Sequence, residues 1–135
     1  MNPKHVAELV EHRLEQARAA IEDAQFLLDG KRTPAAIINR AYYAMFYAAL
    51  ALLQTIGKTP SKHTGVISLF DTEFMMKGIF SRELSRALHD AFDARLVSDY
   101  QPVRPATPVE ATALLLRARR FVAEVERHLA TRDAS

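Results

Sequence analysis

Residues 39–53 read NRAYYAMFYAALALL, and this stretch decides the fold. After Arg40 it carries no charge, so a helix formed by it is apolar on every side. Such a helix is stable in water only when other helices surround it. It contains three tyrosines, Tyr42, Tyr43 and Tyr47, and a buried tyrosine hydroxyl needs a hydrogen-bond partner. We therefore expect the central helix of a bundle, with polar side chains gathered at one end.

The first part of the chain has clear helix boundaries. Apolar residues recur at three- and four-residue steps over residues 3–29, and Gly30 is suited to end that helix. Thr33 and Pro34 are typical of a helix start, and we expect the second helix to close just before Gly57. The sequence thus predicts two long helices joined by a short turn.

Three more helices are expected in the second half. A short third helix should cover residues 65–76, and a fourth should begin after Ser81 and end near Tyr100, because three prolines follow. Thr107 and Glu110 have the spacing of a capping box and open a fifth helix. The sequence therefore predicts an all-α, single-domain fold over residues 1–135. Its architecture should be an antiparallel up-and-down bundle of four long helices and one short helix.

Composition excludes several classes of function. The chain of 135 residues has no cysteine, which excludes disulfides, thiolate metal sites and thiol nucleophiles. It lacks a glycine-rich phosphate loop and a pair of histidines at metal-ligand spacing, so we expect no metal and no cofactor. The longest apolar run, residues 41–53, is shorter than the roughly 20 residues that cross a bilayer. We expect a cytoplasmic protein that does not interact with a membrane.

Positive charge is concentrated in one part of the chain. The net charge is only +2, but residues 31–62 contain five basic side chains and no acidic one. The favoured interpretation is that these side chains, Lys62 among them, solvate the ends of an apolar helix. The alternative is a basic rim that binds phosphate.

Two groups of residues are candidates for a binding site. His63 lies in a polar stretch, SKHTG, where free amides at a helix start could hold an anion, although Ser61 or Thr64 could equally cap that helix. Arg95 and Asp99 share a helix face, which favours a salt bridge between them. Alternatively, Arg95 lines a groove with Arg40 and Tyr100 and binds a phosphate or a stacked base.

Three segments of the chain are informative together: NRAYYAMFYAALALL, SKHTGVISLF and ARLVSDY. In this order they resemble the HEPN superfamily of small nucleotide-binding helical bundles, and the resemblance extends over about residues 5–130. It implies a helical bundle that forms a homodimer. It also implies a possible nucleotide or RNA ligand and pairing with a minimal nucleotidyltransferase as a toxin–antitoxin system. Many relatives of this kind are metal-independent endoribonucleases.

The ribonuclease members carry an arginine, then four to six intervening residues, then a histidine. In this chain Arg95 matches the arginine, but Tyr100 stands in place of the histidine. Tyrosine has an unperturbed pKa near 10 and is a poor base at neutral pH. Arg82 and His89 also satisfy the spacing, but about one such pair is expected by chance in a chain of this composition. The replacement of the motif histidine by Tyr100 argues against ribonuclease activity.

Two functional hypotheses follow. The preferred one is a non-catalytic module, a homodimer that binds a nucleotide, RNA or a nucleotidyltransferase antitoxin. Its binding residues would be the candidates Arg40, Tyr42, Tyr43, Lys62, His63, Arg95, Asp99 and Tyr100. The alternative is a metal-independent endoribonuclease toxin in which His63 replaces the missing histidine. A third interpretation assigns Tyr42, Tyr43 and Phe46 to packing alone, in the core or at a dimer interface.

Overall fold

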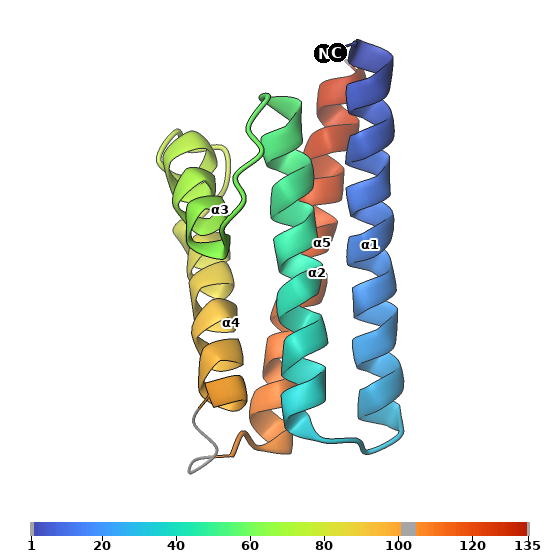
Figure 1. Cartoon of the computed structure of the whole chain (residues 1–135), viewed down its shortest axis with the longest axis vertical. Helices are drawn as coiled ribbons and strands as arrows, with labels where there is room; N and C mark the ends of the chain where they lie inside the picture. Colours follow the sequence, from blue (N-terminus) through green and yellow to red (C-terminus); the bar gives the residue numbers. More distant parts are fainter. Residues whose placement is uncertain (1, 101–104, 135) are drawn as a thin grey trace.

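The structure, a computed structural model, describes residues 2–100 and 105–134, apart from the side chains of residues 98–100, 133 and 134. It is an all-α bundle, as the sequence predicts (Figure 1). The helices are α1 (Pro3–Asp29), α2 (Pro34–Thr55), α3 (His63–Phe70), α4 (Arg82–Tyr100) and α5 (Pro108–Ala134), with a π-helical turn, η1 (Asp71–Met75), after α3.

Helix α2 is the centre of the bundle. It contacts α1, α3, α4 and α5, and α1 and α4 lie on opposite sides of it (Figure 1). Half of its 22 residues are buried, and its buried alanines have no exposed surface, which lets the neighbouring helices approach closely. By length and composition α2 could cross a membrane, but 61% of the 18-residue window that meets this test is buried inside the bundle. The cytoplasmic location stays a prediction.

The long helices begin where the sequence indicates. The Thr107 hydroxyl accepts a hydrogen bond from the Glu110 amide at 3.1 Å, so it caps α5 as predicted. It also donates to the Glu110 carboxylate at 3.2 Å, in place of the bond from the Thr107 backbone amide to that carboxylate in a full capping box. Ser81 caps α4 by accepting from the Leu84 amide at 3.2 Å. Thr33 occupies the capping position of α2, but its side chain makes no capping hydrogen bond.

The third helix differs from its prediction. It begins at His63 rather than residue 65, and Lys62 takes the capping position without a side-chain bond, so neither Ser61 nor Thr64 caps it. It gives way to η1 after Phe70. At this point the carboxylate of Asp71 accepts from the Ser85 hydroxyl and lies 2.6 Å from the His89 ring on α4. The bonds from Asp71 to Ser85 and His89 of α4 thus form at the point where the regular α3 helix ends and η1 begins.

The two threonine caps give a matched test of this interpretation. Replacing Thr107 with alanine removes a capping bond, so we expect the free energy of unfolding to fall by about 1 kcal/mol. Thr33→Ala removes no such bond, and we expect a loss of less than about 0.5 kcal/mol. Urea denaturation of both variants measures the difference, and equal losses would contradict the assigned caps.

Candidate functional site

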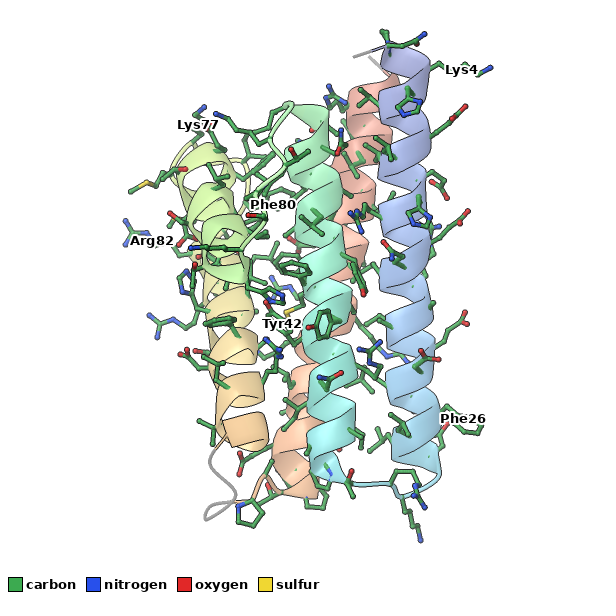
Figure 2. The ribbon with its side chains drawn as sticks, viewed as in Figure 1. Lys4, Phe26, Tyr42, Lys77, Phe80 and Arg82 are labelled. Atoms are coloured by element: carbon green, nitrogen blue, oxygen red, sulfur yellow. The ribbon has the colours of Figure 1, made fainter. Side chains whose placement is uncertain are left out.

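Side chains from three helices meet beside the middle of α2, where Tyr42 is labelled in Figure 2. We call this group the Arg–Tyr cluster. Its members are Arg40, Tyr42, Tyr43, Phe46, His63 and Arg95. Five of the eight candidate residues from the sequence are therefore brought together, from α2, the start of α3 and α4. Tyr42 is buried, whereas the other five members are half-buried and in part reachable from solvent.

Two guanidinium groups lie against the same aromatic ring. The Cζ atom of Arg40 is 5.1 Å from the centre of the Tyr43 ring, and that of Arg95 is 5.4 Å from it. Arg95 is also 5.5 Å from the centre of the Tyr42 ring. The negative faces of the rings offset part of the positive charge. The arrangement concentrates two permanent positive charges, which favours an anion beside them.

Tyr42 fixes the orientation and the tautomer of His63. Its side chain is fully buried, and its hydroxyl oxygen lies 2.7 Å from Nδ1 of His63. Burial raises the pKa of Tyr42 far above its ordinary value, against a smaller opposing effect of Arg95, so the hydroxyl keeps its proton. Among the described residues, Nδ1 of His63 is the hydrogen-bond partner of this hydroxyl. Because a buried hydroxyl that keeps its proton needs an acceptor, we assign Tyr42 as the donor and Nδ1 as the acceptor, which places the proton of the neutral ring on Nε2.

The surroundings keep His63 neutral. Burial lowers the pKa of His63, and the positive charge of Arg95 lowers it further. The imidazole ring stacks on Phe46 with 4.2 Å between ring centres and 16° between planes. His63 is thus a fixed N–H donor at neutral pH, because its second nitrogen is already occupied by Tyr42.

The other candidate residues lie apart from the cluster or outside the described side chains. Lys62 is exposed and occupies the capping position of α3. Asp99 and Tyr100 belong to the last turn of α4, but their side chains lie outside the described residues. The predicted pairing of Arg95 with Asp99, and any role of Tyr100, therefore stay predictions.

The chance pair on α4 is not part of the cluster. His89 is exposed, and its Nε2 contacts Asp71 at 2.6 Å, which ties η1 to α4. Arg82 is also exposed, on the outer side of the bundle (Figure 2). Within the described residues, no group of three or more His, Asp or Glu side chains is placed to hold a metal ion.

Sequence reasoning missed two aromatic side chains at the site, the cluster member Phe46 and its neighbour Phe92. Phe46, which the sequence assigned only to packing, stacks on His63, and Phe92 of α4 lies 5.9 Å from Tyr42 between ring centres. The position of Phe46 carried a usable signal, because it follows Tyr42 by four residues and so shares its helix face. Phe92 carried a similar signal, because it precedes Arg95 by three residues and so shares its helix face.

Comparisons with known proteins agree with this architecture. Residues 10–128 match the HEPN domain family. A protein named "UPF0332 protein" from Thermotoga maritima is 38% identical over 100 residues, which cover 74% of each chain. A protein named "Putative toxin MJ0605" from Methanocaldococcus jannaschii is 32% identical over 126 residues, which cover 93% of this chain and 92% of that protein.

A solved structure is also similar. The crystal structure of TT1696 from Thermus thermophilus superposes with a TM-score of 0.74 at 23% identity, covering 88% of this chain and 97% of that one. At this level of identity the likeness shows a shared fold. The family match extends over most of the chain and includes every member of the Arg–Tyr cluster. This chain therefore belongs to the HEPN domain family.

Proposed function

We propose that this HEPN domain is a non-catalytic module that binds the sugar–phosphate backbone of single-stranded RNA through the Arg–Tyr cluster. The observation that carries the proposal is the convergence of Arg40 and Arg95 on the Tyr43 ring. Half-buried guanidinium groups form strong, charge-assisted hydrogen bonds with phosphate oxygens. The partly exposed ring of Tyr43 also offers a surface on which a base can stack.

His63 supports binding rather than cleavage. Cleavage of RNA needs a group that takes the proton of the 2′-hydroxyl. His63 cannot do so in the arrangement described, because Nδ1 accepts from Tyr42 and Nε2 carries a proton. It can instead donate its Nε2 proton to a phosphate oxygen.

The alternative function is that of a metal-independent endoribonuclease toxin. One observation favours it: His63 lies close enough to Arg95 for the guanidinium charge to lower its pKa. Two similar proteins from Methanocaldococcus jannaschii also carry the name "Putative toxin". A change of tautomer, in which Nδ1 donates to the Tyr42 hydroxyl, would free Nε2 for base catalysis.

We also propose that the domain forms a homodimer in the cytoplasm and pairs with a minimal nucleotidyltransferase, as the resemblance implies. Several large apolar side chains are exposed and so available for protein contacts, among them Phe26, Met76, Val109 and Leu116. Phe26 points away from the bundle on the outer side of α1 (Figure 2). Light scattering that finds a monomer at micromolar concentration would rule out the dimer.

Arg95 provides the first test of RNA binding. We expect Arg95→Gln to weaken binding of a fluorescent single-stranded RNA by about ten- to a hundredfold, because one charge-assisted hydrogen bond contributes roughly 1.5–3 kcal/mol. Fluorescence anisotropy at fixed ionic strength measures the change. Arg86→Gln is the matched control, since Arg86 is an exposed arginine on the same helix. An equal loss in both variants would argue for unspecific attraction.

Cleavage is tested separately from binding. We expect purified protein to leave single-stranded RNA intact in the presence of a chelator, because the basic nitrogen of His63 is occupied by the Tyr42 hydroxyl. Gel electrophoresis of labelled RNA over several hours is the measurement. Cleavage that disappears in both Arg95→Ala and His63→Ala would instead establish the endoribonuclease.

The protonation state of His63 can be measured directly. We expect its pKa to lie below the ordinary value of 6.5 and to rise in Arg95→Met, because that variant removes a positive charge but keeps a long side chain. Nitrogen-15 NMR should show the proton on Nε2, and Tyr42→Phe should allow the other tautomer to appear. A ring protonated on Nδ1 in the unaltered protein would refute the assignment of Tyr42 as donor.

A further inference from the structure

A cleft of about 350 Å³ opens beside the Arg–Tyr cluster. It lies between α1, the C-terminal half of α2 and residues 56–62, which join α2 to α3. Its walls include Arg13 of α1, Phe46 and Tyr47 of α2, Lys58 of the connecting segment and His63 of α3. A cavity of this size can hold one nucleotide unit of a larger ligand.

The charge of this cleft is not balanced by acidic groups. None of the residues that line it is acidic. Arg13 donates to the neutral amide oxygen of Gln16 at 2.9 Å. Lys58 is exposed, and Glu73, the carboxylate whose pKa it helps to lower, is bonded to Lys77 at 2.7 Å. Two positive charges are therefore available to an anion in the cleft.

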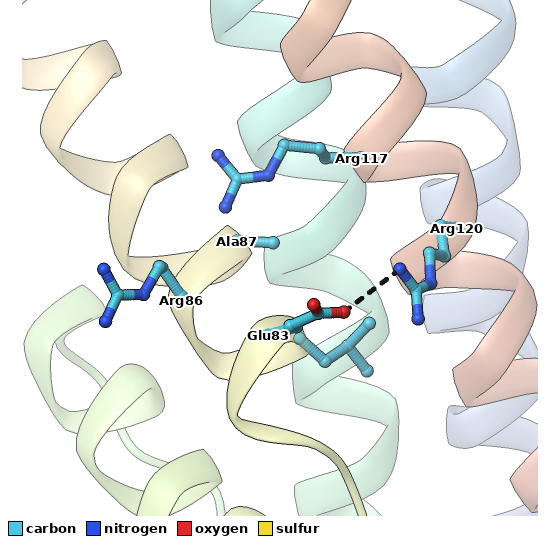
Figure 3. A pocket seen from close by; sticks show the side chains of 6 residues that line it. Glu83, Arg86, Ala87, Arg117 and Arg120 are labelled. Atoms are coloured by element: carbon cyan, nitrogen blue, oxygen red, sulfur yellow. Dashed lines mark hydrogen bonds and ion pairs between the residues drawn. The ribbon is translucent and has the colours of Figure 1, made fainter.

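A second groove of about the same volume shows the opposite situation. It lies between α4 and α5 and contains Arg86, Arg117 and Arg120 around Glu83 (Figure 3). Carboxylates accompany these arginines, because Arg117 pairs with Asp90 at 3.0 Å and Arg120 lies 3.4 Å from both Glu83 and Glu124. This groove has no excess positive charge, although it contains more arginines than the first cleft.

The first cleft and the Arg–Tyr cluster share two side chains. Phe46 and His63, which stack on each other, are members of the cluster and also line the cleft. The Tyr47 ring lies 6.1 Å from the Phe46 ring between centres, and it extends the aromatic surface into the cleft. A nucleic-acid strand bound at the cluster can therefore continue into the cleft over the stacked rings of Phe46 and His63.

We propose that this cleft is a second subsite for the RNA strand bound at the Arg–Tyr cluster. Arg13 and Lys58 bind the phosphate of the adjacent nucleotide, and the aromatic wall of Phe46 and Tyr47 contacts its base. The inference rests on the proposed function, because it assumes RNA at the cluster. The second subsite also defines the path of the RNA strand over the protein, from α4 across α2 toward α1.

The test compares two double variants that remove the same charge. Arg13→Gln combined with Lys58→Gln alters the cleft, and Arg82→Gln combined with Arg86→Gln removes two exposed arginines from α4. Binding of a fluorescent eight-nucleotide single-stranded RNA is measured by anisotropy at several salt concentrations. Circular dichroism confirms that each variant is folded.

We expect the cleft variant to bind about tenfold more weakly than the α4 variant. The slope of log affinity against log salt should become less steep by about 0.7, because the contact with one phosphate is lost. Equal effects in the two double variants would overturn the subsite.

The result for Arg95→Gln separates this inference from the proposed function. If Arg95→Gln weakens binding and the cleft variant matches its control, only the subsite fails. If the cleft variant weakens binding but Arg95→Gln does not, the RNA is held by the cleft without the Arg–Tyr cluster. In that case the proposed function is wrong, and so is the inference that one strand contacts both sites. If the unaltered protein does not bind the RNA, both proposals fail together.

Discussion

The buried hydroxyl of Tyr42 is the constraint on which the arrangement of the site depends. Helix α2 is surrounded by its neighbours, so this polar group has no access to water and must find a partner within the protein. The partner, Nδ1 of His63, comes from a residue 21 positions further along the chain. An unsatisfied buried hydroxyl would cost about 1–3 kcal/mol. The bond therefore holds the start of α3 against α2 and brings a histidine beside Arg95.

Most of the fold could be predicted because its signals are local. The apolar length of α2, the Thr107–Glu110 pair and the prolines after α4 are all visible within a few residues of sequence. Thr33 shows the limit of this reasoning. Three residues after Thr33 the chain has Ala36, whereas three residues after Thr107 it has Glu110. The amide of Ala36 donates to the backbone carbonyl oxygen of Thr33 and not to its hydroxyl. The π-helical turn could not be predicted, since the partners of Asp71 are on α4.

The candidate site was predictable in its composition but not in its geometry. Arg40, Tyr42 and Tyr43 are close in sequence, and the family resemblance pointed to Arg95. The Tyr42–His63 bond depends on how α3 packs against α2, which no local pattern specifies. The same holds for the cleft, because Arg13 is on α1 and Lys58 follows α2, so only the folded bundle brings them together.

The protonation states of the cluster favour a role in binding. Arginine stays charged throughout the physiological range, burial keeps the proton on Tyr42, and burial together with Arg95 keeps His63 neutral. A general acid or base works best when its pKa lies near the operating pH, because it must then gain and lose a proton in each turnover. In the Arg–Tyr cluster the guanidinium groups and the Tyr42 hydroxyl are instead held in one protonation state, and the hydrogen bond assigned to Tyr42 occupies the basic nitrogen of His63. Such a set of fixed charges and donors is suited to hold an anion rather than to move a proton.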